Sequence, residues 1–236
     1  MGSNYRKADL SENIFEIRYK PNSKILDHRG TWAEIISKEL TLTEWSIVGN
    51  RFDVHDLEKK ETVFVGFRNC GYTCFNSPTA NYFPDKATKF YKLLSGLEGF
   101  GNPIFIERIG VRSKFITSHS KGFEDLRNRY SIRYLAITEK AISEIRANLV
   151  DIGGPLNFSD KLGNFNTMSG PMKKDQMKEF ISSQKDYPDV GLYYDIDYWQ
   201  KPNKELDANE IIRMIKSFSS EAWERHERIR NLICGG

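Results

Sequence analysis

The sequence has few cysteines, no long apolar run and almost no excess of charge of one sign. Its three cysteines, Cys70, Cys74 and Cys234, are odd in number, and their spacing matches no common zinc or redox motif. We therefore expect reduced thiols, no metal and no cofactor. No apolar stretch approaches the roughly 18 residues of a membrane span, and the first residues hold no apolar signal core. We expect a cytoplasmic protein with no membrane partner.

Signatures of catalysis are also lacking. The chain contains no P-loop, no nucleophile elbow and no helix with paired zinc-binding histidines. The net charge is only +3, which does not require a nucleic acid partner, although a local basic patch leaves one open. We assign no catalytic residue on this basis, and we expect a binding protein rather than an enzyme.

What the sequence does contain is a composition that can fold. Hydrophobic residues make up 39% and charged residues 28% of the 236 residues, and aromatics reach 13%. Aromatic residues in alternating runs favour sheet. We predict an α+β fold with a mixed, largely antiparallel sheet and a long C-terminal helix. Residues 1–236 form a single domain or two intimate lobes divided near residue 102, that is 1–102 and 103–236.

The order of expected elements suggests an internal repeat. A strand over 14–20, a helix opened by a capping box at Thr31 and Glu34, three strand-like runs (45–54, 62–68 and 72–75) and a helix from Pro84 fill the first half. A similar order can be drawn through 104–232, so a duplicated strand–helix–strands–helix unit stays open.

In the second half the pattern predicts strands over 104–116, 132–137 and 192–199. A helix from Thr138 should turn Ala141, Ile142, Ile145 and Leu149 inward. The stretch 156–188 is the least regular, with strands and an irregular helix near 176–181. Whether it is ordered by itself cannot be read from the sequence.

The strongest pattern belongs to the C-terminal helix. Asp207 and Glu210 have the spacing of a capping box. An apolar stripe at helical spacing follows, formed by Ile211, Ile215, Phe218, Ala222, Ile229 and Ile233. Glu221 with Arg225, and Glu224 with Arg228, are spaced for ion pairs on its outer face. His226 falls near the inner stripe, where a boundary histidine with a local partner is expected rather than a metal ligand.

Charged side chains also alternate with apolar ones along three strands. Arg108, Arg112 and Lys114 share one face of the 104–116 strand, while Phe105, Ile109, Val111 and Phe115 face the core. Arg18 and Lys20 repeat this arrangement on the first strand, and Asp195 and Asp197 share a face of the strand over 192–199. These seven charged residues are the candidate ligand-binding residues. They could clamp an anion such as phosphate, or pair with one another as an ion lattice.

Three short segments resemble a known family. They are the run Phe15–Tyr19, the run Glu107–Arg112 and the run Tyr194–Asp197 before a long closing helix. Together they resemble an uncharacterised prokaryotic family of conserved hypothetical proteins of about this length, which is sporadically distributed. The resemblance brings no activity, cofactor or catalytic residue. Sporadic distribution is associated with anti-phage defence systems.

These observations lead to two hypotheses about function. The first is a non-catalytic binding or regulatory protein that recognises a protein partner encoded nearby, or an anionic, phosphate-bearing ligand, within an anti-phage defence system. The alternative is an enzyme on a phosphate-containing substrate, which would use the arginine-lined strands and the Asp195/Asp197 pair. A phosphate held among those residues would favour the enzyme, and an exposed apolar patch would favour the binding protein.

Overall fold

The computed structural model describes residues 10–101, 104–182 and 186–235. Its elements, in chain order, are β1 (Leu10–Tyr19), α1 (Lys24–Leu40), β2 (Glu44–Val48), β3 (Arg51–Asp56), β4 (Glu61–Gly66), β5 (Asn69–Phe75), α2 (Tyr82–Ser95), β6 (Ile106–Ser118), α3 (Phe123–Arg129), the π-helical turn η1 (Tyr130–Tyr134), α4 (Glu139–Ile145), β7 (Gly154–Asp160), β8 (Gly163–Lys173), α5 (Lys174–Phe180), β9 (Val190–Gln200) and α6 (Ala208–Cys234). The predicted α+β class and the long C-terminal helix are confirmed.

The nine strands of the described residues form one antiparallel sheet. Their order across it is β2-β3-β4-β5-β1-β6-β9-β8-β7. Strands β1 and β6 pair at the centre, β5 returns beside β1, and β9 returns beside β6. Each half therefore runs strand, helix, meander, helix, the order that a duplicated unit would have, although α5 interrupts the second meander. The sheet is continuous across both halves.

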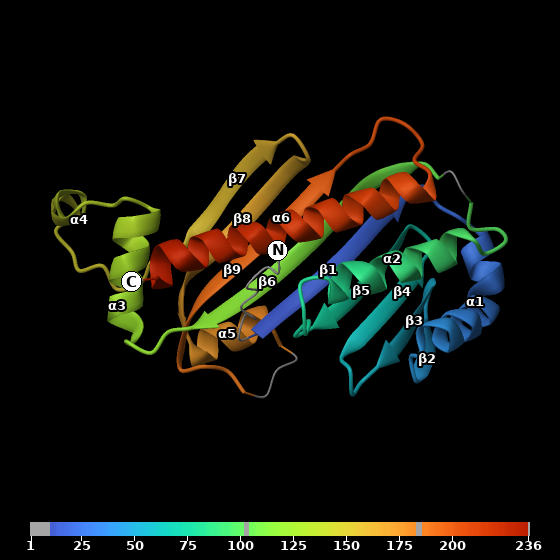
Figure 1. The fold of residues 1–236 in the computed structure, drawn as a ribbon, viewed down its shortest axis with the longest axis horizontal. Coiled ribbons are helices and arrows are strands. Elements are labelled where there is room, and N and C mark those ends of the chain that lie inside the picture. The colour runs from blue at the N-terminus through green and yellow to red at the C-terminus, as the bar shows by residue number, and fades with distance from the viewer. Residues whose placement is uncertain (1–9, 102–103, 183–185, 236) are drawn as a thin grey trace, which may run out of the picture.

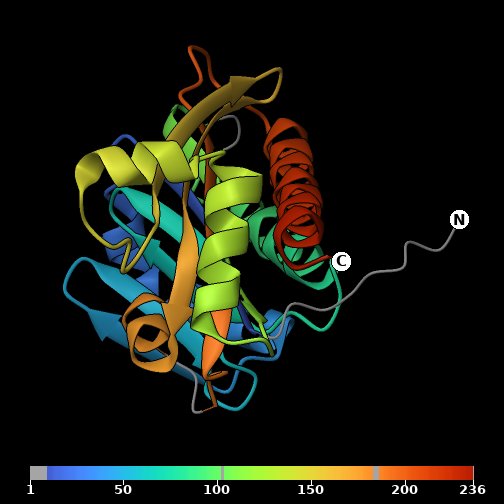
Figure 2. The same cartoon turned by 90° about the vertical axis from the view of Figure 1, so that its left-hand side faces the viewer.

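Helices cover one face of this sheet (Figure 1). Helix α1 packs on β2 and β3, α2 packs on β5 and α6, and α6 crosses β6 and β9. The main core lies between these layers, where odd-numbered residues of β1 such as Phe15 and Ile17 meet residues such as Phe90 and Phe218. Figure 2 shows α5 on the opposite side of the sheet from α6. A smaller core around Met177 and Tyr193 lies beneath α5.

Helix α6 forms as its sequence predicts. The Asp207 side chain accepts a hydrogen bond from the Glu210 backbone N–H, and the Glu210 side chain accepts one from the Asp207 N–H. The stripe residues Ile211, Ile215, Phe218, Ala222 and Ile233 are buried, and Ile229 is partly buried against the core. Both outer-face pairs are present, Glu221 with Arg225 and Glu224 with Arg228. Within the described residues, no helix is both long and apolar enough to cross a membrane.

Several local predictions were wrong. Helix α1 begins at Lys24, seven residues before Thr31, because the turn after β1 ends at Ser23 and residues 24–30 continue the helix. Residues 130–134 form a π-helical turn, not a strand, since they continue α3. In α4, Ile145 is 73% exposed rather than turned inward, because this short helix extends away from the sheet.

Two predictions about burial were also wrong. Phe105 lies outside β6 and is exposed, with the Lys20 ammonium 4.2 Å from its ring centroid. His226 is fully buried rather than at the boundary, stacked on Phe115 with ring centroids 4.1 Å apart. Its Nε2 lies 3.2 Å from Thr117 Oγ1, so the histidine belongs to the interface between α6 and β6. Both differences depend on how distant elements meet, which local alternation does not record.

Candidate functional site

Six of the seven predicted charged residues gather on the sheet face opposite α6. Strand β6 lies between β1 and β9, and its register sets Arg112 opposite Asp197 and Lys114 opposite Asp195. Because successive strand residues alternate between faces, the even-numbered cations of β6 share their face with the odd-numbered carboxylates of β9. We call this surface, with the β1 side chains that join it, the sheet-face lattice.

The pair between Arg112 and Asp195 is the most complete contact of the lattice. Arg112 Nε donates to Asp195 Oδ1 at 3.0 Å, and Arg112 Nη2 donates to Asp195 Oδ2 at 2.6 Å. The hydroxyl of Tyr193 donates to the same Oδ2 at 3.2 Å. The hydrogen bonds to Asp195 raise the pKa of Arg112 above its usual value. The Asp195 side chain is only 6% exposed, so the two-pronged pair compensates a buried charge.

A second arginine pair runs parallel to the first. Arg108 Nη2 donates to Asp197 Oδ2 at 2.8 Å. This pair has a single hydrogen bond, whereas Arg112 and Asp195 are joined by two prongs. Burial raises the pKa of the Asp197 carboxyl, and the neighbouring Arg108 and Arg112 oppose that rise. The carboxylate therefore depends on these two arginines for its charge.

Strand β1 contributes the remaining pairs. Lys114 Nζ donates to Glu12 Oε2 at 2.6 Å and to the Phe180 carbonyl oxygen at 3.0 Å. Arg18 Nη2 lies 3.1 Å from Glu16 Oε2, and this hydrogen bond raises the pKa of Arg18. Lys20 is exposed beyond the end of β1 and lies outside the lattice.

Each cation of the lattice is thus paired with a carboxylate of the lattice. Its cations are Arg18, Arg108, Arg112 and Lys114, and its carboxylates are Glu12, Glu16, Asp195 and Asp197. Every cation has a carboxylate within 3.1 Å. An anion that bound here would compete with these carboxylates for the same cations. The internal ion lattice is the arrangement present, and the ligand-binding role of these residues stays a prediction.

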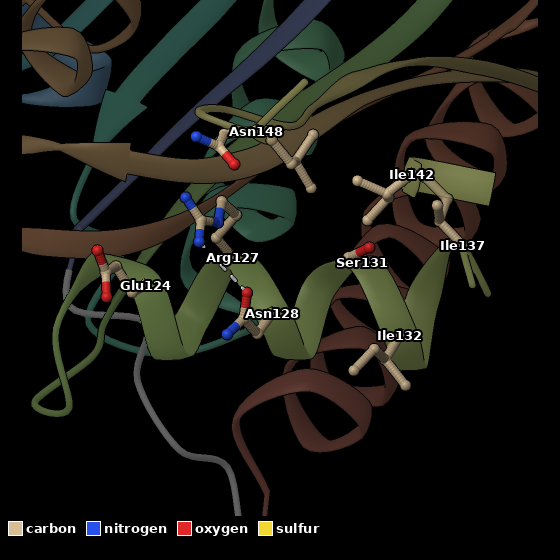
Figure 3. A pocket seen from close by; sticks show the side chains of 9 residues that line it. Glu124, Arg127, Asn128, Ser131, Ile132, Ile137, Ile142 and Asn148 are labelled. Carbon is tan, nitrogen blue, oxygen red and sulfur yellow. Dashed lines mark hydrogen bonds between the residues drawn. The ribbon is translucent and has the colours of Figure 1, made fainter. Parts of the chain in front are cut away.

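A second site lies at the other end of the molecule, where α3, η1 and α4 form a lobe. A cleft of about 470 Å³ opens there, and we call it the α3–α4 cleft. It is lined by Glu124, Arg127, Asn128, Ser131, Ile132, Ile137, Ile142, Asn148 and Leu149. Figure 3 shows Arg127 rising from α3 toward Asn148, and Ser131 on the helix between Arg127 and the isoleucine side chains of 137 and 142.

The polar groups of this cleft are poorly satisfied by the protein. Among the described residues, Arg127 Nε and Ser131 Oγ are buried atoms that find no hydrogen-bond partner. The other Arg127 bonds are long, 3.4 Å from Nη1 to the Val150 carbonyl and 3.5 Å from Nη2 to Asn128 Oδ1. A bond of that length contributes little. A guanidinium with an unpaired Nε and a hydroxyl without a partner, beside isoleucine and leucine side chains, form a site that suits an acidic group on an apolar body.

Apolar side chains continue from the cleft onto the surface of the lobe. Ile132 is 64% exposed, Ile145 is 73% exposed and Val150 is 75% exposed. Exposed apolar residues that gather in a patch commonly mark a surface that binds another protein.

Sequence reasoning did not identify the cleft. It described residues 123–129 only as a polar helical piece and placed a strand over 132–137. One signal was present, because Arg127 and Ser131 are four residues apart and so share a helix face with each other. That spacing by itself does not show whether the face is buried, since the covering residues Asn148 and Leu149 follow α4.

Other candidate chemistry is sparse in the described part of the chain. No group of three or more His, Cys, Asp or Glu side chains there is arranged to hold a metal ion. Cys70 and Cys74 are buried free thiols, and burial raises the pKa of Cys74 to about 12. A thiol with so high a pKa is a poor nucleophile.

Comparison with known proteins adds no assignment. No protein-family model matches the chain, and no curated protein matches its sequence. The function is therefore argued from the two sites described above.

Proposed function

We propose that this protein is a non-catalytic binding protein that holds a protein partner in the α3–α4 cleft. An acidic group of the partner would accept hydrogen bonds from Arg127 and Ser131. Apolar side chains of the partner would cover Ile142 and the exposed isoleucines of the lobe. The observation that carries this proposal is the pair of buried, unsatisfied donors, Arg127 Nε and Ser131 Oγ, in a cleft whose lining also includes isoleucine and leucine side chains.

The physical argument rests on the cost of leaving such groups unpaired. A buried polar atom without a hydrogen bond costs about 1–3 kcal/mol. A ligand carboxylate that completes those bonds recovers this cost on binding, and the charge-assisted bond to a guanidinium is among the stronger kinds. The sheet-face lattice offers no comparable gain, because each of its arginines already has a carboxylate.

The experiment is purification of the native complex from the host, comparing Arg127→Met with Arg228→Met. Arg228 is 72% exposed on α6 and pairs with Glu224, so its replacement serves as a matched control for loss of one arginine. We expect a stoichiometric partner with the wild type and Arg228→Met, and its loss with Arg127→Met. Retention of the same partner by Arg127→Met would contradict the proposal.

The partner's gene and the anti-phage role stay predictions, as does the alternative of an enzyme acting on a phosphate-containing substrate. In that alternative, Arg108 and Arg112 would bind a phosphate in competition with Asp197 and Asp195. Titration with inorganic phosphate tests this point. Saturable binding that Arg108→Met abolishes and Arg127→Met leaves intact would favour the enzyme and count against the cleft.

A further inference from the structure

The two edges of the sheet differ in what they offer to another strand. Strands β2 and β7 lie at opposite edges (Figure 1). In the described part of the chain, no strand pairs with the outer side of either. An exposed edge with free backbone N–H and C=O groups is a template for a further strand, and proteins commonly block it with proline or lysine.

The β2 edge has a defined set of outward groups. The hairpin to β3 turns over Gly49 and Asn50, with Gly49 at φ +60°, and closes on the pair Val48–Arg51. A two-residue hairpin closes on a hydrogen-bonded pair, and such pairs alternate along the ladder. Glu44, Ser46 and Val48 therefore bond to β3. The backbone N–H and C=O of Trp45 and Ile47 point outward.

The β7 edge contains a proline that hinders the addition of a further strand, and β2 contains none. Its hairpin closes on the pair Asp160–Gly163, so the outward residues are Pro155, Asn157 and Ser159. Proline has no N–H to donate, and Pro155 thus interrupts the row of donors. No proline or lysine occurs in β2, which reads Glu-Trp-Ser-Ile-Val.

Side chains of β2 are also uncovered. Trp45 is 41% exposed, Ile47 is 43% exposed and Val48 is 57% exposed, so α1 does not cover the rim of this strand. Trp45 and Ile47 share the face of Val54 and Phe52, their buried partners on β3. A strand added here would extend the apolar face of the sheet.

We propose that the strand added at this edge is β2 of a second copy of this chain. Two β2 strands related by a two-fold axis through Ser46 place Trp45 opposite Ile47 of the second copy. In this register the outward backbone N–H and C=O groups of Trp45 face those of Ile47. The same register places Glu44 opposite Val48 of the second copy, and Ser46 opposite Ser46. No like charges meet, the apolar Trp45 and Ile47 meet each other, and four edge residues of the two copies gain ladder hydrogen bonds.

Charge placed at Val48 tests this register. In the two-fold arrangement, Val48→Lys faces Glu44 of the second copy, and Val48→Glu faces it with a like charge. Each contact occurs twice in the dimer, so the dissociation constants of the two variants should differ roughly tenfold or more. Within one chain residue 48 lies opposite Arg51, so the effect on the monomer has the opposite sign and cannot imitate this result.

The measurement is sedimentation equilibrium of the full chain over a wide concentration range. We expect a reversible monomer–dimer equilibrium for the wild type, a tighter dimer for Val48→Lys and a weaker one for Val48→Glu. The double variant Glu44→Lys with Val48→Glu should restore association. A wild type that stays monomeric throughout would overturn the proposal. A dimer equally strong in both single variants, or a β2 edge occupied by a different protein's strand, would also overturn it.

Discussion

The two faces of the central sheet are stabilised in different ways. The face under α2 and α6 buries large apolar side chains, among them Phe115, Tyr198 and Phe218. The opposite face carries the sheet-face lattice, in which Arg112 and Asp195 pair across neighbouring strands. Apolar burial is non-directional and roughly proportional to area, whereas an ion pair gains only the surplus of attraction over desolvation. The covered face should therefore determine stability, and the lattice should determine strand register.

The largest expected effect tests the covered face. Phe218 is buried on α6 and stacks on Tyr198 with ring centroids 5.5 Å apart. Phe218→Ala should lower the free energy of unfolding by about 3–5 kcal/mol through lost burial and a cavity. Denaturation with urea measures it. A loss that changes with salt concentration, or one below about 1 kcal/mol, would show that α6 is not the stabilising layer.

A smaller effect comes from the histidine buried in the same layer. Burial lowers the pKa of His226 to about 3, from 6.5. The unfolded chain binds a proton below pH 6.5 and the folded chain does not, so stability is full above pH 6.5 and falls as the pH drops toward 3. The loss between pH 7 and pH 5 should be about 2 kcal/mol.

The control for this prediction is His226→Gln, which cannot titrate. Urea unfolding at several pH values should give a flatter stability profile for the variant than for the wild type. Glu227 and Arg230 lie on the same helix turn, and the Glu227 carboxylate is 3.8 Å from His226 Nδ1. Parallel profiles for the two proteins would show that His226 takes up its proton in the folded state.

The lattice should show coupling rather than large individual effects. Arg112→Met leaves Asp195 buried without its main partner, and Asp195→Asn leaves Arg112 unpaired. The double variant leaves no unpaired charge. Its loss of unfolding free energy should therefore be about 1 kcal/mol smaller than the sum of the losses in the two single variants. A double-mutant cycle by urea unfolding measures this coupling. Strictly additive costs would mean that the pair does not act as a unit.

The smallest effect distinguishes the cleft from the lattice. Arg127 makes no ion pair with the described residues, and its Nε is unsatisfied. Arg127→Met removes this unsatisfied atom, so it should not lower the free energy of unfolding by more than about 0.5 kcal/mol. Thermal unfolding beside Arg112→Met provides the comparison. A loss as large as that of Arg112→Met would assign Arg127 a structural role and weaken the proposed binding function.

Much of the fold followed from periodicity. The alternation along 192–199 and the stripe from Ile211 to Ile233 correctly predicted β9 and α6, because local spacing fixes which side chains share a face. The same alternation correctly predicted that Arg108 shares a face with Arg112, and that Asp195 shares a face with Asp197. The start of helix α1 and the turn at 130–134 were predicted wrongly, since their boundaries depend on tertiary contacts.

The sequence by itself determined the two charged faces and the apolar faces behind them. Only the tertiary structure decided that these charged faces meet. Arg112 and Asp195 are 83 residues apart, and their contact requires β9 to return beside β6, which no local pattern encodes. The same holds for the α3–α4 cleft, because residues on both sides of α4 must converge before Arg127 and Ser131 become buried. Faces are set by neighbours in the chain, whereas the partner of each face is set by the path of the whole chain.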